Sequence, residues 1–288
     1  MLQDLASGLV IGLAYALIAL GLSLIFGVLR IIDFAHGEFY MLGGLMLYSL
    51  TSRGFSFFPS LAGAVLGTMV VAIVIDWCVL KPLRRSDEVT IALATLGLSI
   101  FLANAALVIW GPVPHQIPSP FSMDPLVLPG GVYLSRLELF GAAATLVIMA
   151  AMHLVLQYTS VGRQMRAVVQ DRDAAAVVGL NVDLIYRMTF AAGCGLAAIA
   201  GGLLGTMFLV YPGMGLQAVL KAFAVVVIGG MGSFSGAVAG GLLLGLAESL
   251  GGAWLPSGYK DIVAFIMIVA VLALRPQGLL GSRQVRIR

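Results

Sequence analysis

The stretch Q-Y-T-S-V-G-R-Q-M-R-A-V-V-Q-D-R-D-A-A-A-V-V-G-L-N-V-D-L-I-Y-R, at Gln157–Arg187, is the one sizeable polar segment of a largely apolar chain. The segment holds seven charged side chains: Arg163, Arg166, Asp171, Arg172, Asp173, Asp183 and Arg187. The apolar runs on both sides are long enough to cross a bilayer, so this segment predicts a water-exposed loop between membrane spans.

Within this segment, the pattern predicts two short amphipathic helices. Ser160 can cap a helix in which Met165, Val168 and Val169 share one face. Asp171 or Asp173 can cap a second helix through 174–176, which Gly179 then ends. Two such helices on a membrane surface would present arginines and aspartates to a soluble partner; an ordinary solvated loop is the alternative.

The composition indicates an integral membrane protein. Of the 288 residues, 60% are hydrophobic and 10% are charged, whereas soluble domains carry roughly 25% charged residues. The two cysteines, Cys78 and Cys194, lie in apolar runs without disulfide or zinc spacing and are expected to be small buried hydrophobes. The net charge of +3 is explained by membrane topology and does not indicate binding to nucleic acid.

The apolar runs predict an all-α, polytopic fold in a single domain, 1–288, with about eight transmembrane segments, one or more of them broken. A span needs about 20 apolar residues. The expected spans lie near 5–28, 37–52, 58–80, 90–110, 138–157, 188–210 and 261–274. The region 219–250 is also apolar, but the run G-G-M-G-S-F-S-G at Gly229–Gly236 divides it into two short halves.

Basic residues indicate the orientation, because cytoplasmic loops are enriched in Lys and Arg. One side of the predicted topology collects 12 of the 16: Arg30, Lys81, Arg84, Arg85, Arg163, Arg166, Arg172, Arg187, Arg275, Arg283, Arg286 and Arg288. The distribution predicts an external N-terminus, a cytoplasmic C-terminus and a cytoplasmic 157–187 segment.

The sequence carries no sign of catalysis or of a cofactor. None of the three lysines follows a glycine, which excludes a P-loop for ATP in this chain. His36, His115 and His153 share no ligand spacing, so we expect no metal site. We therefore expect a chain that is not an enzyme.

Two groups of residues are candidates for a translocation path. Asp33, His36 and Glu38 lie between the first two spans, either at a re-entrant break or at the cytoplasmic interface, which is the interpretation we favour. Gly232, Ser233 and Ser235 form the second group, at a helix break expected at membrane depth, where non-helical backbone must avoid lipid. The spacings Gly8/Gly12 and Gly241/Gly245 predict close helix packing within the subunit.

Four stretches carry a resemblance to a known family. They are V-G-R-Q-M-R-A-V-V-Q-D-R-D-A-A-A-V-V-G-L-N-V in the polar segment, I-F-G-V-L-R-I-I-D-F-A-H-G-E-F-Y-M-L-G at Ile25–Gly43, V-V-I-G-G-M-G-S-F-S-G-A-V-A-G-G at Val226–Gly241 and R-P-Q-G-L-L-G at Arg275–Gly281. The chain resembles the LivH-type permeases of branched-chain amino acid ABC importers over nearly its whole length. Asp33 departs from the asparagine expected in that family, which puts any role of that amide in doubt.

The resemblance implies an ABC-importer permease fold in the bacterial inner membrane, working by alternating access. It implies four partners in the bilayer and around it: a second, homologous permease, two cytoplasmic ATPases and a periplasmic substrate-binding protein. The segment 157–187 would couple to the ATPases through Arg163, Arg166, Asp171, Asp173, Ala175 and Gly179. Related permeases for urea, amides or aromatic acids remain alternatives for the substrate, and a stand-alone secondary transporter or channel remains an alternative class.

Overall fold

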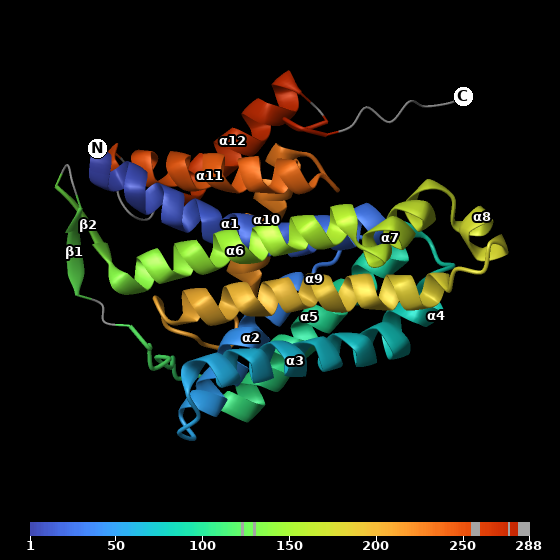
Figure 1. Cartoon of the computed structure of the whole chain (residues 1–288), viewed down its shortest axis with the longest axis horizontal. Helices are drawn as coiled ribbons and strands as arrows, with labels where there is room; N and C mark the ends of the chain where they lie inside the picture. The colour runs from blue at the N-terminus through green and yellow to red at the C-terminus, as the bar shows by residue number, and fades with distance from the viewer. Residues whose placement is uncertain (122–123, 129–130, 255–259, 276, 282–288) are drawn as a thin grey trace.

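The computed structural model describes residues 1–121, 124–128, 131–254, 260–275 and 277–281, and most of these residues are helical. The long helices lie along one axis of the molecule (Figure 1). In chain order, the elements are α1 (Leu2–Leu29), α2 (His36–Thr51), α3 (Phe57–Ile75), a π-helical turn (Asp76–Leu80), α4 (Lys81–Leu83), α5 (Glu88–Trp110), β1 (Pro125–Leu128), β2 (Val132–Ser135), α6 (Arg136–Tyr158), α7 (Ser160–Gln170), α8 (Arg172–Val177), α9 (Val182–Gly205), α10 (Met214–Gly229), α11 (Phe234–Trp254) and α12 (Lys260–Leu274).

The two ends of the bundle differ in structure. The strands β1 and β2 and the N-terminus lie at one end, and α7 and α8 lie at the other (Figure 1). We call these the hairpin end and the coupling end, the second after the role that the resemblance implies for segment 157–187. A membrane would have to lie between them, across the long helices.

Six helices among the described residues are long and apolar enough to span a bilayer: α1, α3 with its continuation to Leu83, α5, α6, α9 and α11. Their outward faces carry large apolar side chains, as at Leu93, Val108 and Val147, whose exposed fractions are 63%, 86% and 68%. Exposure of so much apolar surface to water would be unfavourable, so these faces suit contact with lipid. The prediction of a polytopic all-α membrane protein is confirmed. The total of about eight spans stays a prediction.

Two expected spans have different bounds in the structure. The run near 188–210 begins six residues earlier, because Asn181 caps α9 by accepting a hydrogen bond from the Leu184 amide at 3.0 Å. The region 219–250 divides into α10 and α11, joined by a turn at 230–233. Gly230 and Gly232 have φ values of 107° and 76° in this turn, a conformation that favours glycine.

A β-hairpin is the one departure from the all-α prediction in the described chain. Residues Pro125–Leu128 pair antiparallel with Val132–Ser135 within the proline-rich connection between α5 and α6. Proline removes backbone donors and disfavours a helix here, whereas short extended strands can use the remaining donors.

The predicted glycine packing is found between α1 and α11. A Cβ atom on Gly12 would lie 2.9 Å from the carbonyl oxygen of Gly241, and one on Gly8 would lie 3.0 Å from that of Gly245. Such a close approach of two helix backbones is possible only where side chains are absent. The glycines thus pack within the subunit, as expected.

The segment between α1 and α2 folds back into the bundle. Arg30 ends α1 in the left-handed conformation, with φ at 56°. Asp33 Oδ1 then accepts a hydrogen bond from the Ala35 amide at 3.0 Å, at the start of α2. His36 Nε2 lies 3.1 Å from the carbonyl oxygen of Ile18, eleven residues before the end of α1. Helix α2 therefore starts beside the middle of α1 and not at its end.

Helix α10 begins at the same depth as α2. A Cβ atom on Gly37, the second residue of α2, would collide with the carbonyl of Gly215, the second residue of α10. From this junction, α2 runs toward the hairpin end, where Trp110 Nε1 donates to Ser49 Oγ at 2.6 Å. In contrast, α10 runs toward the coupling end, where the turn at Gly232 contacts Gly27 of α1. Two short helices thus start together inside the bundle and diverge, an arrangement found in transporters with broken helices.

Candidate functional site

Residues 157–187, which we call the coupling segment after their expected role, contain the two short helices that the sequence predicted, α7 and α8. Asp171 separates them in an extended conformation, and its Oδ1 accepts hydrogen bonds from the amides of Asp173 and Ala174, both at 2.9 Å. Thr159, and not Ser160, caps α7, because its hydroxyl accepts from the Gly162 amide at 3.3 Å. Gly179 follows α8 with φ at 87° and provides the expected stop.

One face of these helices is held against the bundle. Met165 and Val168 of α7 and Ala175 of α8 are buried in one apolar cluster with Val28 of α1 and the start of α9. Gly162 lies so close to Leu156 of α6 that a Cβ atom there would collide with the Leu156 carbonyl. The coupling segment is therefore in contact with α1, α6 and α9.

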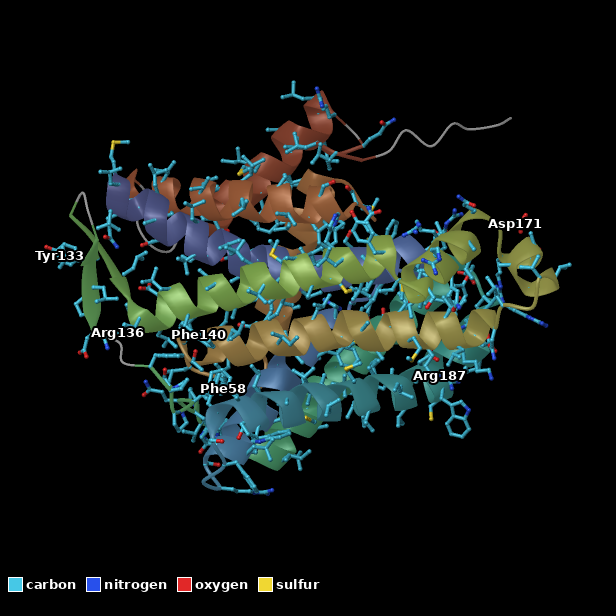
Figure 2. All side chains as sticks on the ribbon, viewed as in Figure 1. Phe58, Tyr133, Arg136, Phe140, Asp171 and Arg187 are labelled. Carbon is cyan, nitrogen blue, oxygen red and sulfur yellow. The ribbon has the colours of Figure 1, made fainter. Side chains whose placement is uncertain are left out.

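The opposite face is exposed. Arg163, Asp171 and Asp173 are exposed, in agreement with the polar surface expected from the sequence. Figure 2 shows Asp171 at the extreme of the coupling end. Val177, the last residue of α8, and Val178, which follows it, are apolar, yet their side chains are 87% and 75% exposed. We call these two residues the tip of α8. Sequence reasoning missed them, because adjacent valines in an otherwise apolar chain give no sign of exposure.

The two arginines of α7 bind the end of α6. Arg166 donates from Nη1 to the carbonyl oxygen of Leu156 and from Nη2 to that of Gln157, the second at 3.4 Å. Arg163 Nη1 donates to the carbonyl oxygen of Tyr158 at 3.2 Å. These carbonyls are among the last of α6, where positive charge also complements the helix dipole. Arg163 and Arg166 thus hold the joint between α6 and α7, a role that the sequence did not suggest.

A cavity of about 490 Å³ opens next to this joint. Its walls are formed by α1, by α6 and by α7, which contributes Met165 and Arg166. Gly232 of the turn and Ser235 at the start of α11 complete the lining. The sequence placed the turn at membrane depth. In the structure, it joins two antiparallel helices at their ends, next to Gly27 near the end of α1, and its depth in the membrane stays a prediction.

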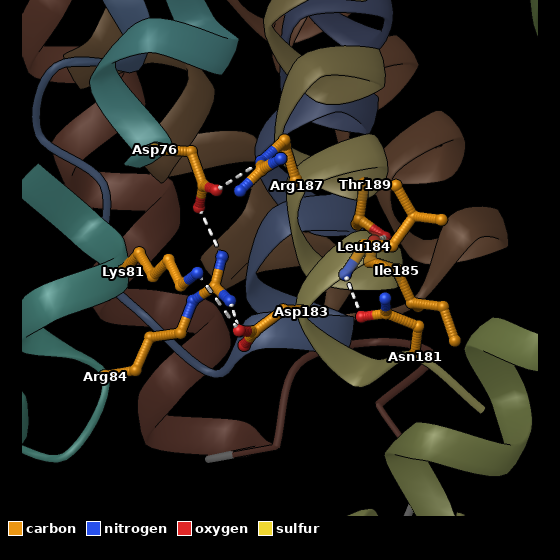
Figure 3. Close-up of polar contacts among 9 residues, drawn as sticks. All are labelled: Asp76, Lys81, Arg84, Asn181, Asp183, Leu184, Ile185, Arg187 and Thr189. Carbon is orange, nitrogen blue, oxygen red and sulfur yellow. Dashed lines mark hydrogen bonds and ion pairs between the residues drawn. The ribbon is translucent and has the colours of Figure 1, made fainter. Parts of the chain in front are cut away.

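Five charged side chains connect the π-helical turn and the α4 region to the start of α9 (Figure 3). Asp76 is fully buried and accepts from Arg84 Nη2 at 2.6 Å and from Arg187 Nε at 3.3 Å. Arg84 Nη1 also donates to Asp183 Oδ1 at 2.6 Å. Lys81 Nζ also pairs with Asp183 Oδ2, at 3.6 Å.

A nearby carboxyl outside the spans has a shifted pKa. Asp87 caps α5 and accepts hydrogen bonds from Thr90, from the hydroxyl at 2.7 Å and from the amide at 3.0 Å. These bonds to its charged form lower the pKa of Asp87 below the usual value. Its role is local, since it fixes the start of α5 at the coupling end.

Asp33, His36 and Glu38 lie inside the bundle, so the favoured interface interpretation was wrong. All three are buried. Asp33 Oδ2 and His36 Nδ1 are 3.9 Å apart, and neither has a hydrogen-bond partner in the described part of the chain. Glu38 Oε1 accepts from Ser99 Oγ at 3.0 Å, whereas its Oε2 has no partner there. The re-entrant segment at 30–35, the less favoured of the two interpretations drawn from the sequence, accounts for this depth.

Cys194 of α9 completes this buried group. Ligand atoms of Asp33, His36 and Cys194 all lie within 4.8 Å of one another. The histidine spacing in the sequence gave no reason to expect this, because Cys194 is more than 150 positions away from Asp33. The three donors could hold a metal ion by proximity, yet they are wholly buried within the packed helices.

Most of the chain matches a known family. The sequence model of the family described as "Branched-chain amino acid transport system / permease component" matches residues 5–272. The chain belongs to this family. The resemblance seen in the sequence is thereby confirmed, and with it the permease fold.

Curated relatives match over nearly their full length. The chain is 34% identical to the high-affinity branched-chain amino acid transport system permease protein LivH of Escherichia coli K12, with 99% of this chain and 96% of that relative covered. Identity is 33% to LivH of Salmonella typhimurium, with the same coverage. It is 34% to BraD of Pseudomonas aeruginosa, with 99% and 97% covered. These relatives are transport components, in agreement with the expectation of a chain that is not itself an enzyme.

Proposed function

We propose that this chain is one of two membrane subunits of an ABC importer for branched-chain amino acids. The single observation that carries the proposal is the coupling segment: two short helices project at one end of a bundle of membrane-spanning helices that matches LivH-type permeases over 99% of its length. A channel or secondary transporter has no need of such a docking element.

The partners follow from the same proposal. A second, homologous permease lies beside this chain in the bilayer, two ATPases bind from the cytoplasm, and a periplasmic binding protein delivers the substrate. In support, the exposed tip of α8 offers an apolar edge at Val177 and Val178, flanked by the charges of Asp173 and Arg172. A helix with this mixture of exposed groups suits insertion into a groove on a soluble protein.

The segment transmits force through its contacts with the bundle. When an ATPase moves the tip of α8, the apolar cluster at Met165 and Ala175 carries the displacement to α1 and α9. Arg166 carries it to the end of α6. The cavity at this end has walls from α1, α6 and α7, so its width depends on the position of the segment. We take it as the cytoplasmic exit of the path.

The orientation proposed is a hairpin end outside and a coupling end in the cytoplasm of a bacterial cell. In support, residues of the coupling end include Arg84, Arg163, Arg166, Arg172 and Arg187, as the enrichment of basic residues on the cytoplasmic side requires. We expect a reporter active only in the cytoplasm to be active after Arg288, and one active only outside to be active before Met1. Activity of both fusions on one side of the membrane would contradict the orientation.

Purification from native membranes without crosslinking tests the function. We expect a second permease and two ATPases to travel with the chain. Vesicles containing that complex and its binding protein should take up leucine, isoleucine or valine only with ATP. Isolation of this chain without an ATPase, together with ATP-independent uptake, would favour a stand-alone transporter. ATP-driven uptake of urea, an amide or an aromatic acid in place of leucine would change the substrate class alone.

The exit cavity makes a separate prediction for Ser235, which is exposed at its wall. In a protein with Cys78 and Cys194 replaced by serine, a cysteine at Ser235 should react with a small hydrophilic thiol reagent, and ATP should change the rate. A cysteine at Ser60, which is buried, serves as the unreactive control. If Ser235→Cys stays as unreactive as Ser60→Cys in an active complex, the cavity is closed to water and the exit lies elsewhere.

A further inference from the structure

An ion pair connects α10 and α11 in the interior of the bundle. Lys221 Nζ pairs with Glu248 Oε1, and the second carboxylate oxygen of Glu248 accepts from the hydroxyl of Tyr15 at 2.9 Å. The ammonium of Lys221 also lies 5.8 Å from the centre of the Tyr15 ring, within the range of a cation–π interaction. Three helices therefore converge on two opposite charges.

The pair lies inside the ends of the helices, on the side of the hairpin. Glu248 is at the level of Gly8 of α1, since a Cβ atom on Gly8 would lie 2.9 Å from Ser249 Cβ and 3.0 Å from the Gly245 carbonyl. Gly8 is six residues from Leu2, the start of α1. At 1.5 Å per residue, this distance is roughly 9 Å. Tyr15 reaches back to this level because helical side chains tilt toward the N-terminus.

A purely structural contact does not require these charges. At Gly12 and Gly241, helices α1 and α11 achieve a tight contact through their backbones, and this contact needs no charged side chain. Placing Lys221 and Glu248 within a membrane span removes both from water, and buried ion pairs often add no net stability over apolar residues of similar volume. Ionisable groups at such depth are therefore functional candidates.

The pair borders a small cavity of mixed character. The cavity of about 100 Å³ is lined by Lys221, Gln217 and Leu220 of α10 and by Phe265 and Ile268 of α12. Gln217 and Lys221 are four residues apart and thus share one face of α10. The cavity therefore combines apolar side chains with one ammonium and one amide, and the carboxylate of Glu248 is paired with that ammonium.

From this geometry we propose that Lys221 and Glu248 form a binding site for the zwitterionic end of an aliphatic amino acid in transit. The α-carboxylate of the amino acid pairs with Lys221, and its α-ammonium pairs with Glu248. The aliphatic side chain lies against Leu220, Phe265 and Ile268. The inference rests on the proposed function, and it assigns to this chain a part in substrate handling beyond coupling.

The exchange of partners suits a site that must also release its substrate. Before the amino acid arrives, each charge already has an opposite charge beside it, so no unpaired ion stays buried. When the zwitterion enters, two ion pairs replace one, and on departure the original pair forms again. A transit site needs this balance, because a site that binds too tightly slows transport. The side near the hairpin, proposed as external, is where a binding protein would release the substrate.

Two double variants test the proposal in the assembled transporter with wild-type partners. The reversed pair, Lys221→Glu with Glu248→Lys, keeps an ion pair but exchanges its polarity and geometry. The apolar pair, Lys221→Met with Glu248→Met, removes both charges. It provides a second test if the reversed pair does not fold. We expect both variants to assemble with the wild-type partner subunits.

In both variants, the maximal rate of leucine uptake should fall at least tenfold. The external leucine concentration for half-maximal uptake should stay constant, because the binding protein sets it. Uptake at the wild-type rate by either assembled variant would overturn the proposal and leave a structural ion pair. Failure of wild-type vesicles to take up leucine would instead refute the proposed function, so the two results are distinguishable.

Discussion

Replacing Asp76 by alanine should destabilise the protein more than any other change in its charge network. Asp76 is fully buried, and it is bound by both Arg84 and Arg187, whose side chains are 10% and 27% exposed. Removing the carboxylate leaves two guanidinium groups facing each other in a partly buried site. Loss of one partner from a buried pair costs about 3–5 kcal/mol. We expect the apparent unfolding temperature in detergent to fall by on the order of 10 °C.

The matched control is Lys81→Ala in the same network. Lys81 pairs with Asp183 at 3.6 Å, but these two side chains are 43% and 45% exposed. Exposed ion pairs contribute about 0–1 kcal/mol, so this variant should unfold within about 2 °C of the wild type. Equal effects of Asp76→Ala and Lys81→Ala would show that burial of Asp76 does not decide the outcome.

The sequence predicts well those features that depend on neighbouring residues. The cap at Asp171, the stop at Gly179 and the amphipathic face with Met165 and Val168 are all local patterns, and the structure has them. The membrane class follows from composition, because no soluble fold can expose so much apolar surface. The packing of Gly8 and Gly12 could also be predicted from the sequence, since their spacing alone places them on one helix face.

Local sequence patterns could not predict the contacts between residues that are far apart in the sequence. The depth of His36 follows from its contact with Ile18, which requires that residues 30–35 fold back along α1. The charges of Lys221 and Glu248 are 27 positions apart and meet only because α10 and α11 are antiparallel. In a membrane protein, polar contacts of this kind carry much of the function, so the candidate site was less predictable than the fold.

The two arginines of α7 combine a contact within the chain with a proposed contact to the ATPase. Arg163 and Arg166 were expected to contact the ATPase, and their exposure leaves that role as a proposal. Their guanidinium groups meanwhile bind the final carbonyls of α6. A charge reversal at either position would therefore affect the α6–α7 joint as well as docking. Val177 and Val178 provide a cleaner test, because both side chains are almost entirely exposed in this chain alone.

Val177→Asp should abolish coupled transport while leaving the subunit folded. At 87% exposure, Val177 contributes almost nothing to the core, so the monomer should tolerate the change. If the tip of α8 inserts into an apolar groove of the ATPase, the new carboxylate must be desolvated without a partner, which costs several kcal/mol. Each 1.4 kcal/mol is a factor of ten, so we expect ATPase affinity to fall about 100-fold or more.

The measurement combines three readouts on the purified complex: retention of the ATPase, ATP-driven leucine uptake and the unfolding temperature of the permease. Val178→Asp should behave in the same way, since that side chain is 75% exposed on the same tip. Val177→Ile, which keeps an apolar branched side chain, should preserve all three and serves as the control. If Val177→Asp retains the ATPase and transports at the wild-type rate, the tip of α8 stays in water and the coupling contact must lie on the charged face at Asp171 and Asp173.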